Sequence, residues 1–285
     1  MRVFRDFFLV TAAAESSSVL PIKGYNGEFL TLDTKFDPVK HSTRIGRISS
    51  VPLDFSEKSI DSNTVKMGDK VLFHHFVVQP HNAWLIDRKT YYKAIWEHVW
   101  AKIEFDKLIP LNDWVFVEPI REEESALFCD TLKLKEYTEN ISQTGIVFAS
   151  SGHCKLKGLF EGTKIHFIKD ADYEIKFGDK IFWRMKLGAV LTTENDGEIY
   201  PLANQILVEQ DEQPDKVEKV GLLMPENQRR KELSGTIRGV GDGMDLHTQT
   251  LVGDRVTYFR GMFGNFNYWG KNYSVLNPLD VIYVG

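Results

Sequence analysis

Alternating apolar and polar positions predict strands along most of this chain, and the pattern is clearest in its last third. Three segments there have the two-residue period of a half-buried strand, at 201–209, 233–240 and 251–259. A further apolar run at 279–284 has the composition of a closing strand. Gly, Pro, Asn and Asp, which favour turns, stand between these segments. The pattern therefore predicts a small all-β domain at 201–285.

One apolar segment inside this domain does not fit a core strand. It lies in a highly charged stretch at 209–232. Its centre is Gly221, Leu222, Leu223, Met224 and Pro225. Large apolar side chains on a solvated loop are typical of a site that another molecule binds. The same side chains could instead tuck into the domain or a neighbouring unit, and the flanking charges favour the exposed loop.

Two short repeats extend the strand pattern to the rest of the chain. An apolar residue, Gly-Asp, a basic residue and a β-branched residue occur in that order at 67–73, 177–183 and 252–258. Gly-Asp supplies a turn and the following apolar run supplies a strand. The pattern P-L-x-x-x-[VI]-x-V-E occurs at 110–118 and again, without gaps, at 201–209. Each copy of this second repeat marks the opening strand of a unit.

The repeats predict three tandem small β-barrels after an N-terminal arm. The expected limits are 1–17 for the arm and 18–109, 110–200 and 201–285 for the barrels. In the first barrel we expect the opening strand at 27–32 and the second strand at 42–48. Segment 91–100 could be taken for a helix, but its β-branched and aromatic residues allow a closing hairpin.

The order of the C-terminal segments resembles the GroES-type co-chaperonin family. The match consists of the P-L…I-L-V-E strand, the G-L-L-M-P-E loop, G-T-I-R-G-V-G-D-G, V-G-D-R-V and the closing strand, over about 85 residues. The first two units resemble the family more weakly. The resemblance implies three GroES-like barrels, a homo-oligomeric ring, and a flexible loop that docks on a chaperonin to assist protein folding.

The resemblance also implies roles for the residues of the loop. Leu222, Leu223 and Met224 would be the anchors in a groove of the chaperonin rim. Gly221 would allow the turn, and Pro225 would limit the freedom of the loop before it binds. A disordered loop loses conformational freedom on docking, so each contact would be weak and reversible, and several loops on one ring would add avidity.

A second class of function stays open, namely a structural or assembly protein such as a viral capsid decoration or cementing protein. Only one unit has the docking-type loop, and three barrels per chain do not divide evenly into the family's seven-fold ring. Such a protein would bind itself or a capsid lattice, in a virion. The aromatic residues Phe263, Phe266, Tyr268 and Trp269 suit an interface between subunits, or equally a hairpin over the barrel.

Composition limits the remaining classes of function. The net charge of −5, with no basic face evident, argues against nucleic acid as a partner. No run approaches the ~18 apolar residues of a membrane span. The start of the chain faintly resembles a signal peptide, but Arg5 and Asp6 interrupt its apolar run. Cys129 and Cys154 make no disulfide framework, so reduced thiols in the cytoplasm are expected.

The sequence has no pattern that predicts an enzyme. It contains no Ser-His-Asp order with a nucleophile elbow, no phosphate-binding loop before a helix and no metal signature. The Gly-rich segment at 239–243 lies between strands, so we interpret it as a turn. His153 and Cys154 have no second ligand pair at metal-site spacing, and His74, His75 and His81 are expected to be structural. We therefore expect neither a cofactor nor a metal.

Overall fold

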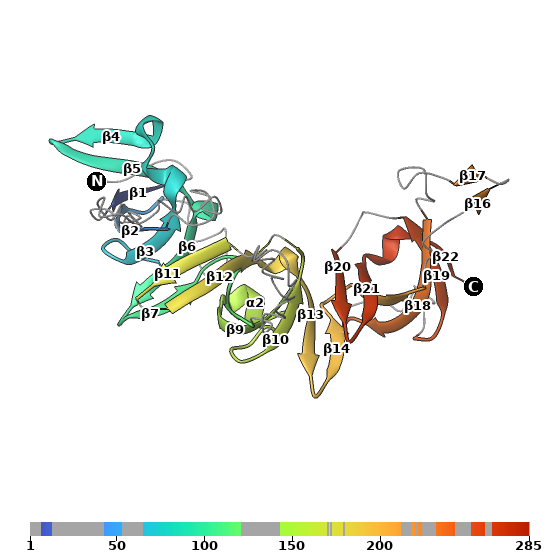
Figure 1. Cartoon of the computed structure of the whole chain (residues 1–285). Helices are drawn as coiled ribbons and strands as arrows, with labels where there is room; N and C mark the ends of the chain where they lie inside the picture. The colour runs from blue at the N-terminus through green and yellow to red at the C-terminus, as the bar shows by residue number, and fades with distance from the viewer. Residues whose placement is uncertain are drawn as a thin grey trace, which may run out of the picture. The chain divides into compact units, whose positions relative to one another are not determined.

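A computed structural model of the chain shows an all-β fold, which confirms the predicted class (Figure 1). The residues that it describes are 7–12, 43–52, 65–120, 143–169, 171, 173–178, 180–211, 218–219, 222–223, 232–242, 252–259 and 264–284. Every strand pairing whose register is resolved is antiparallel, and the helices in these segments are single turns such as α2 (Gly152–Lys155). No helix in these segments is long and apolar enough to cross a membrane.

The first sheet has seven described strands in the order β4-β5-β1-β2-β3-β6-β7. They are β1 (Phe7–Ala12), β2 (Thr43–Ser50), β3 (Lys70–His74), β4 (Ala83–Ile86), β5 (Lys89–Ile95), β6 (Val99–Glu104) and β7 (Lys107–Pro110). β1 lies between β2 and β5 in the middle of this sheet, within the segment for which an N-terminal arm was expected. Its first four residues are buried, so the apolar run there serves the sheet itself.

Two other expectations for the first unit have different outcomes. The strand expected near 42–48 is β2, whereas the opening strand expected at 27–32 lies outside the described residues. Segment 91–100 contains the end of β5, a 3-10 turn (Trp96–His98) and the start of β6. The preference for strand over helix is confirmed, but the hairpin is wrong: β5 pairs with β4 and β1, and β6 pairs with β3 and β7.

The second and third sheets repeat this order. The second, β11-β12-β8-β9-β10-β13-β14, has β8 (Trp114–Pro119), β9 (Thr144–Ser150), β10 (Lys164–Phe167), β11 (Tyr173–Phe177), β12 (Lys180–Lys186), β13 (Val190–Asn195) and β14 (Glu198–Pro201). The third, β20-β21-β15-β18-β19-β22, has β15 (Ile206–Gln210), β18 (Glu232–Val240), β19 (Arg255–Phe259), β20 (Gly264–Tyr268), β21 (Lys271–Leu276) and β22 (Val281–Val284).

All three sheets therefore share one topology. Three consecutive strands lie side by side, a hairpin then pairs with the first of them, and the next strand pairs with the third. The order of hydrogen-bonded strands has two ends in every case, so these barrel-like sheets do not close completely. The internal repetition that the sequence predicted is thus present as a repeated strand order.

The repeats found in the sequence correspond to this topology with one exception. The chain leaves β7 at Pro110 and β14 at Pro201, so the P-L repeat marks each passage to the next sheet. Gly68 and Gly253, both with positive φ (92° and 104°), precede the third strands β3 and β19. Gly178, in contrast, precedes the hairpin strand β12, so the second Gly-Asp copy is not equivalent to the others.

By its contacts the chain groups into two compact units. One contains the first sheet with β8, β11 and β12, and the other contains β10, β13 and β14 with the third sheet. The middle sheet is divided because each of its parts packs against a different neighbouring sheet. The limits 18–109, 110–200 and 201–285 therefore remain predictions.

Candidate functional site

The predicted docking segment contains a small hairpin of its own. β16 (Glu218–Lys219) pairs with β17 (Leu222–Leu223), with Glu218 opposite Leu223 and Lys219 opposite Leu222. These two strands form a separate sheet, and the register leaves two residues between them, a favoured length for a β-hairpin connection. Gly221, Met224 and Pro225 lie outside the described residues.

The hairpin belongs to the long connection between β15 and β18, which are neighbours in the third sheet. The first and second sheets have long connections at the same place, at 13–42 and 120–143. The topology therefore places a long connection between the first and second strands of each of the three sheets. Of these, the third has the apolar segment that the sequence analysis selected.

The base of this connection is fixed by a carboxylate. Asp211 directly follows β15, and its backbone N–H donates to the carbonyl oxygen of Ser234 at 2.9 Å. Its carboxylate accepts hydrogen bonds from the Ser234 hydroxyl at 2.6 Å and from the Arg255 guanidinium at 2.5 Å. These bonds join the ends of β15, β18 and β19. The hairpin therefore extends from an ordered base.

A second polar group stands beside this base and ties it to the hairpin β20–β21. The Gln210 side-chain amide donates to the Ser274 hydroxyl at 2.5 Å, and Ser274 donates to the Asn265 side-chain oxygen at 2.7 Å. The Tyr258 hydroxyl donates to Ser274 at 3.1 Å, and burial raises the pKa of Tyr258. Sequence reasoning missed this group because its members come from four different strands.

A glycine lies where β18 passes close to β15. A Cβ on Gly235 would meet the backbone carbonyl oxygen of Glu209, and a Cβ on Gly46 in β2 would meet that of Thr11 in the same way. Gly145 has the corresponding place in β9, opposite Ile165 of β10 as Gly235 is opposite Val256 of β19. A glycine at this position of each second strand is a sequence signal that the repeat search overlooked.

The candidate interface aromatics have different environments. Phe266, 3% exposed, stacks on His166 of β10 with ring centroids 4.9 Å apart. The Tyr268 hydroxyl donates to the carbonyl oxygen of Gly197 at 2.9 Å. Trp269 is 86% exposed, and Phe263 lies outside the described residues. Phe266 and Tyr268 thus pack between sheets of one chain, and an interface between copies at these aromatics stays a prediction.

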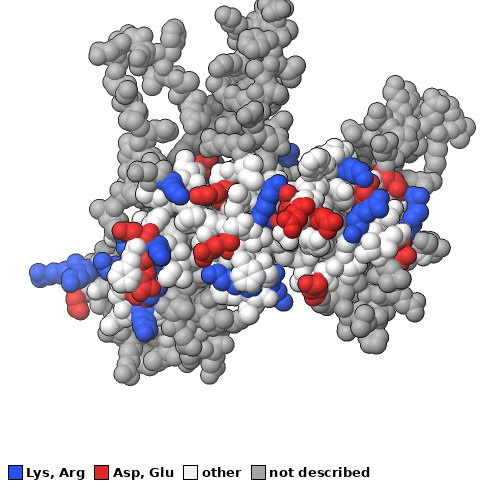
Figure 2. Space-filling model, turned by 90° about the horizontal axis from the view of Figure 1, so that it is seen from below, with Lys and Arg blue, Asp and Glu red and all other residues white. Residues whose placement is uncertain are grey.

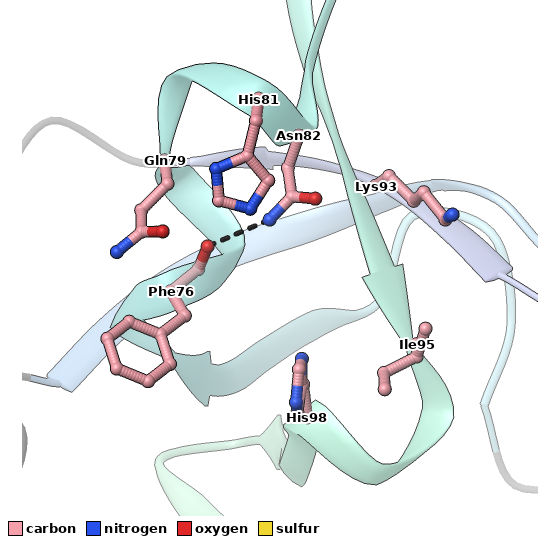
Figure 3. Close-up of a pocket in the computed structure, with 7 residues that line it drawn as sticks. All are labelled: Phe76, Gln79, His81, Asn82, Lys93, Ile95 and His98. Carbon is pink, nitrogen blue, oxygen red and sulfur yellow. Dashed lines mark hydrogen bonds between the residues drawn. The ribbon is translucent and has the colours of Figure 1, made fainter.

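A shallow pocket beside the 3-10 turns of the first sheet has a volume of about 310 Å³ (Figure 3). Its lining residues are Phe76, Gln79, His81, Asn82, Lys93, Ile95 and His98. The Asn82 side-chain amide donates to the Phe76 carbonyl oxygen at 2.9 Å, which closes the turn. These described lining residues include no carboxylate that could pair with a histidine for acid–base chemistry.

His74, beside this pocket, is held neutral by its surroundings. His74 stacks on His75 with ring centroids 4.6 Å apart. Burial, and after it the positive charge of Arg184, lowers the pKa of His74 to about 3. Among the described residues no three His, Cys, Asp or Glu side chains gather as a metal site would require. On the face that Figure 2 shows, acidic and basic side chains are interspersed rather than gathered in one basic patch.

Comparison with known proteins places the C-terminal part of the chain in a family. The family model for the chaperonin 10 Kd subunit matches residues 198–284. The co-chaperonin GroES of Campylobacter curvus (strain 525.92) is 33% identical over 82 residues, which are 29% of this chain and 91% of that protein. The co-chaperonin GroES of Campylobacter concisus (strain 13826) is 32% identical over 82 residues, with the same coverage. Through its third sheet, the chain belongs to the GroES-type chaperonin 10 family.

Proposed function

We propose that this protein is a co-chaperonin that docks the segment at 221–225 onto a chaperonin and so assists protein folding. The observation that carries this proposal is the separate hairpin β16–β17, which lies within the family match and contains Leu222 and Leu223. The relatives that match are themselves named co-chaperonins. In this role Leu222, Leu223 and Met224 insert into an apolar groove, between Gly221 and Pro225.

The anchored base supports this role on physical grounds. Asp211 holds the ends of β15, β18 and β19 together, so the point from which the hairpin extends is fixed. A short segment on a fixed base loses less conformational freedom on docking than an unanchored tail does. Each docking contact is small, and several copies in one assembly strengthen binding through effective concentration. We infer that the protein acts by binding rather than catalysis, as a homo-oligomer in the cytoplasm.

Leu223→Ser tests the proposal. Burial of a leucine side chain contributes about 1.5–3 kcal/mol, so its loss weakens each docking contact by roughly 10- to 100-fold. The full chain is mixed with a chaperonin ring and ATP, and the complex is separated by size-exclusion chromatography. We expect the wild-type protein to elute with the ring and Leu223→Ser to elute alone.

Leu279→Ser is the matched control, because Leu279 is 91% exposed in the 3-10 turn before β22. This variant should bind the ring like the wild-type protein. If the wild-type protein forms no complex with any chaperonin ring, the proposed function is wrong. Equal loss of binding in both variants would show that the effect is not specific to the hairpin.

A further inference from the structure

The pocket beside the 3-10 turns of the first sheet has no part in the proposed docking function. Its lining residues lie outside the segment 198–284 that matches the co-chaperonin family. The two turns His75–Val78 and Pro80–Asn82, with the residue between them, line it with Phe76, Gln79, His81 and Asn82 (Figure 3). The end of β5 and the turn after it contribute Lys93, Ile95 and His98. Its volume of about 310 Å³ is at the lower end of the range of small-molecule sites, so it fits a small ligand.

Hydrogen bonds within the two turns fix one wall of this pocket. The Phe76 N–H donates to the His74 Nδ1 atom at 3.1 Å, and the Asn82 N–H donates to the Gln79 carbonyl oxygen at 3.0 Å. The Phe76 carbonyl oxygen accepts from the Gln79 N–H at 3.3 Å and from the Asn82 side-chain amide at 2.9 Å. The wall is therefore formed before any ligand arrives, which reduces the free-energy cost of ordering it on binding.

Four polar side chains of the lining make no hydrogen bond or ion pair with another described residue. They are Gln79, His81, Lys93 and His98. Gln79, Lys93 and His98 are half-buried, so part of their contact with bulk water is lost. The Lys93 ammonium group lies 4.9 Å from the Phe7 ring centroid, at the rim of the pocket. Amide, imidazole and ammonium groups all donate hydrogen bonds, so the pocket presents a set of unused donors to a ligand.

The charges around the pocket favour an anion, although the whole chain has a net charge of −5. The described lining residues include a lysine and two histidines but no carboxylate. Burial lowers the pKa of His98, the nearby Glu97 carboxylate opposes this effect, and the positive charge of Lys186 lowers the pKa again. His98 is therefore a neutral imidazole at pH 7, with one N–H group to donate. Lys93 and Lys186 supply positive charge beside it.

The kinds of donor favour a phosphate group over a carboxylate. The planar fork of an arginine is the best partner for a carboxylate, and the described lining residues include no arginine. A lysine instead acts as a point charge, which suits a phosphate group whose oxygens accept hydrogen bonds from several directions. Phe76 and Ile95, 38% and 37% exposed, add apolar surface to the same pocket. An organic group attached to the phosphate can pack against them.

We propose that this pocket binds a small phosphate monoester. Its phosphate group accepts hydrogen bonds from Gln79, Lys93 and His98, and its organic group lies along Phe76 and Ile95. The flexible four-carbon stem of Lys93 lets the ammonium group turn from the Phe7 ring to the phosphate. This binding function belongs to the first sheet and does not depend on the docking segment at 221–225.

Phenyl phosphate is the probe, titrated into the full-length protein at constant ionic strength and followed by isothermal titration calorimetry. We expect saturable binding of one molecule per chain at millimolar concentrations or below. Lys93→Met keeps most of the stem and removes the charge, so we expect the affinity to fall by about 10-fold or more. Lys93→Arg keeps the charge and should retain binding. Lys89→Met is the matched control, because Lys89 is exposed in the same strand and does not line the pocket.

Two further ligands and one further variant separate the parts of the proposed site. Benzoate has the same ring with a carboxylate, and we expect it to bind about 10-fold more weakly than phenyl phosphate or not at all. Ile95→Ser removes apolar surface from the pocket. It should weaken the binding of phenyl phosphate several-fold and leave the binding of inorganic phosphate unchanged. Equal urea midpoints of the wild type and the variants show that all of them are folded.

A wild-type protein that shows no saturable binding of phenyl phosphate would overturn the proposal. So would wild-type affinity in Lys93→Met, or an equal loss in Lys89→Met, since the effect would then be one of overall charge. Benzoate that binds as tightly as phenyl phosphate would exclude the phosphate class. None of these measurements contains a chaperonin, so a failure here leaves the docking function to its own test.

Discussion

The contact between Arg184 and Trp100 gives the sharpest prediction about stability. Arg184 is 4% exposed, and its guanidinium carbon lies 3.7 Å from the Trp100 ring centroid and 4.8 Å from that of Tyr173. Burial lowers its pKa to about 10, so the side chain is still charged at neutral pH. Among the described residues, no hydrogen-bond partner meets its Nε atom. Contact with the aromatic ring faces therefore offsets much of the free energy that this charge loses when it leaves water.

A double-mutant cycle measures that compensation. A desolvated cation–π contact contributes about 2 kcal/mol. Trp100→Leu loses this contact, leaves a buried charge less well compensated and opens space, so we expect a loss of about 3 kcal/mol or more. Arg184→Met loses the same contact but removes the desolvation cost, so we expect a change of about 1 kcal/mol or less. The coupling energy should be about 2 kcal/mol.

The free energies of unfolding come from urea titrations of the four proteins, followed by far-UV circular dichroism. The midpoint and slope of the transition that contains the first sheet are compared, because the chain has two compact units. A coupling energy below about 0.5 kcal/mol would contradict the reasoning. The same would follow if Arg184→Met destabilised the protein as much as Trp100→Leu, since the charge would then contribute through other partners.

Two further predictions concern stability. Burial lowers the pKa values of His74, His98 and His166 in the folded chain. As the pH falls below 6.5, the ordinary pKa of histidine, the unfolded chain therefore takes up protons that the folded chain does not. Stability should be highest above the ordinary pKa of 6.5 and should fall between pH 7.5 and 5.5 by at least about 1.4 kcal/mol, the contribution of His74 alone; equal urea midpoints at both pH values would refute this. Gly235→Ala should destabilise the protein by about 1–3 kcal/mol, because the added methyl group meets a backbone carbonyl oxygen of β15. Gly188→Ala, with no atom within 4 Å of the added methyl group, should have little effect, and equal melting temperatures of the two variants would contradict the argument.

Local patterns predicted the strands well because turn chemistry and alternation act over a few residues. The P-L repeat found both passages between sheets, and Gly-Asp was followed by a strand in all three copies. A Gly-Asp turn forms equally well inside a hairpin and before a third strand, so the copy at Gly178 could not be distinguished from the others by sequence. The placement of β1 in the sheet depends on pairing with β2, far along the chain.

The candidate site was predictable in part for the same reason. Leu222 and Leu223 were conspicuous as apolar residues among charges, whereas the anchor at Asp211 joins residues of three strands and has no local signature. The burial of Phe266 could not be predicted from the pattern of apolar and polar residues either, because it depends on how one sheet packs against another. Only the folded chain brings His166 to that ring.

The chain passes from one sheet to the next through Pro110 and Pro201, and this covalent continuity sets the effective concentration of neighbouring sheets. If the sheets were separate subunits, the two contacts between them would form only above some protein concentration. In this chain both contacts are present at any dilution. They are also free to differ in chemistry, because each joins one fixed pair of surfaces. The first uses a charged side chain over Trp100, and the second uses Leu191 against Phe266. In a ring of identical subunits every interface has the same residues. In a fused chain the residues at each contact between sheets can differ.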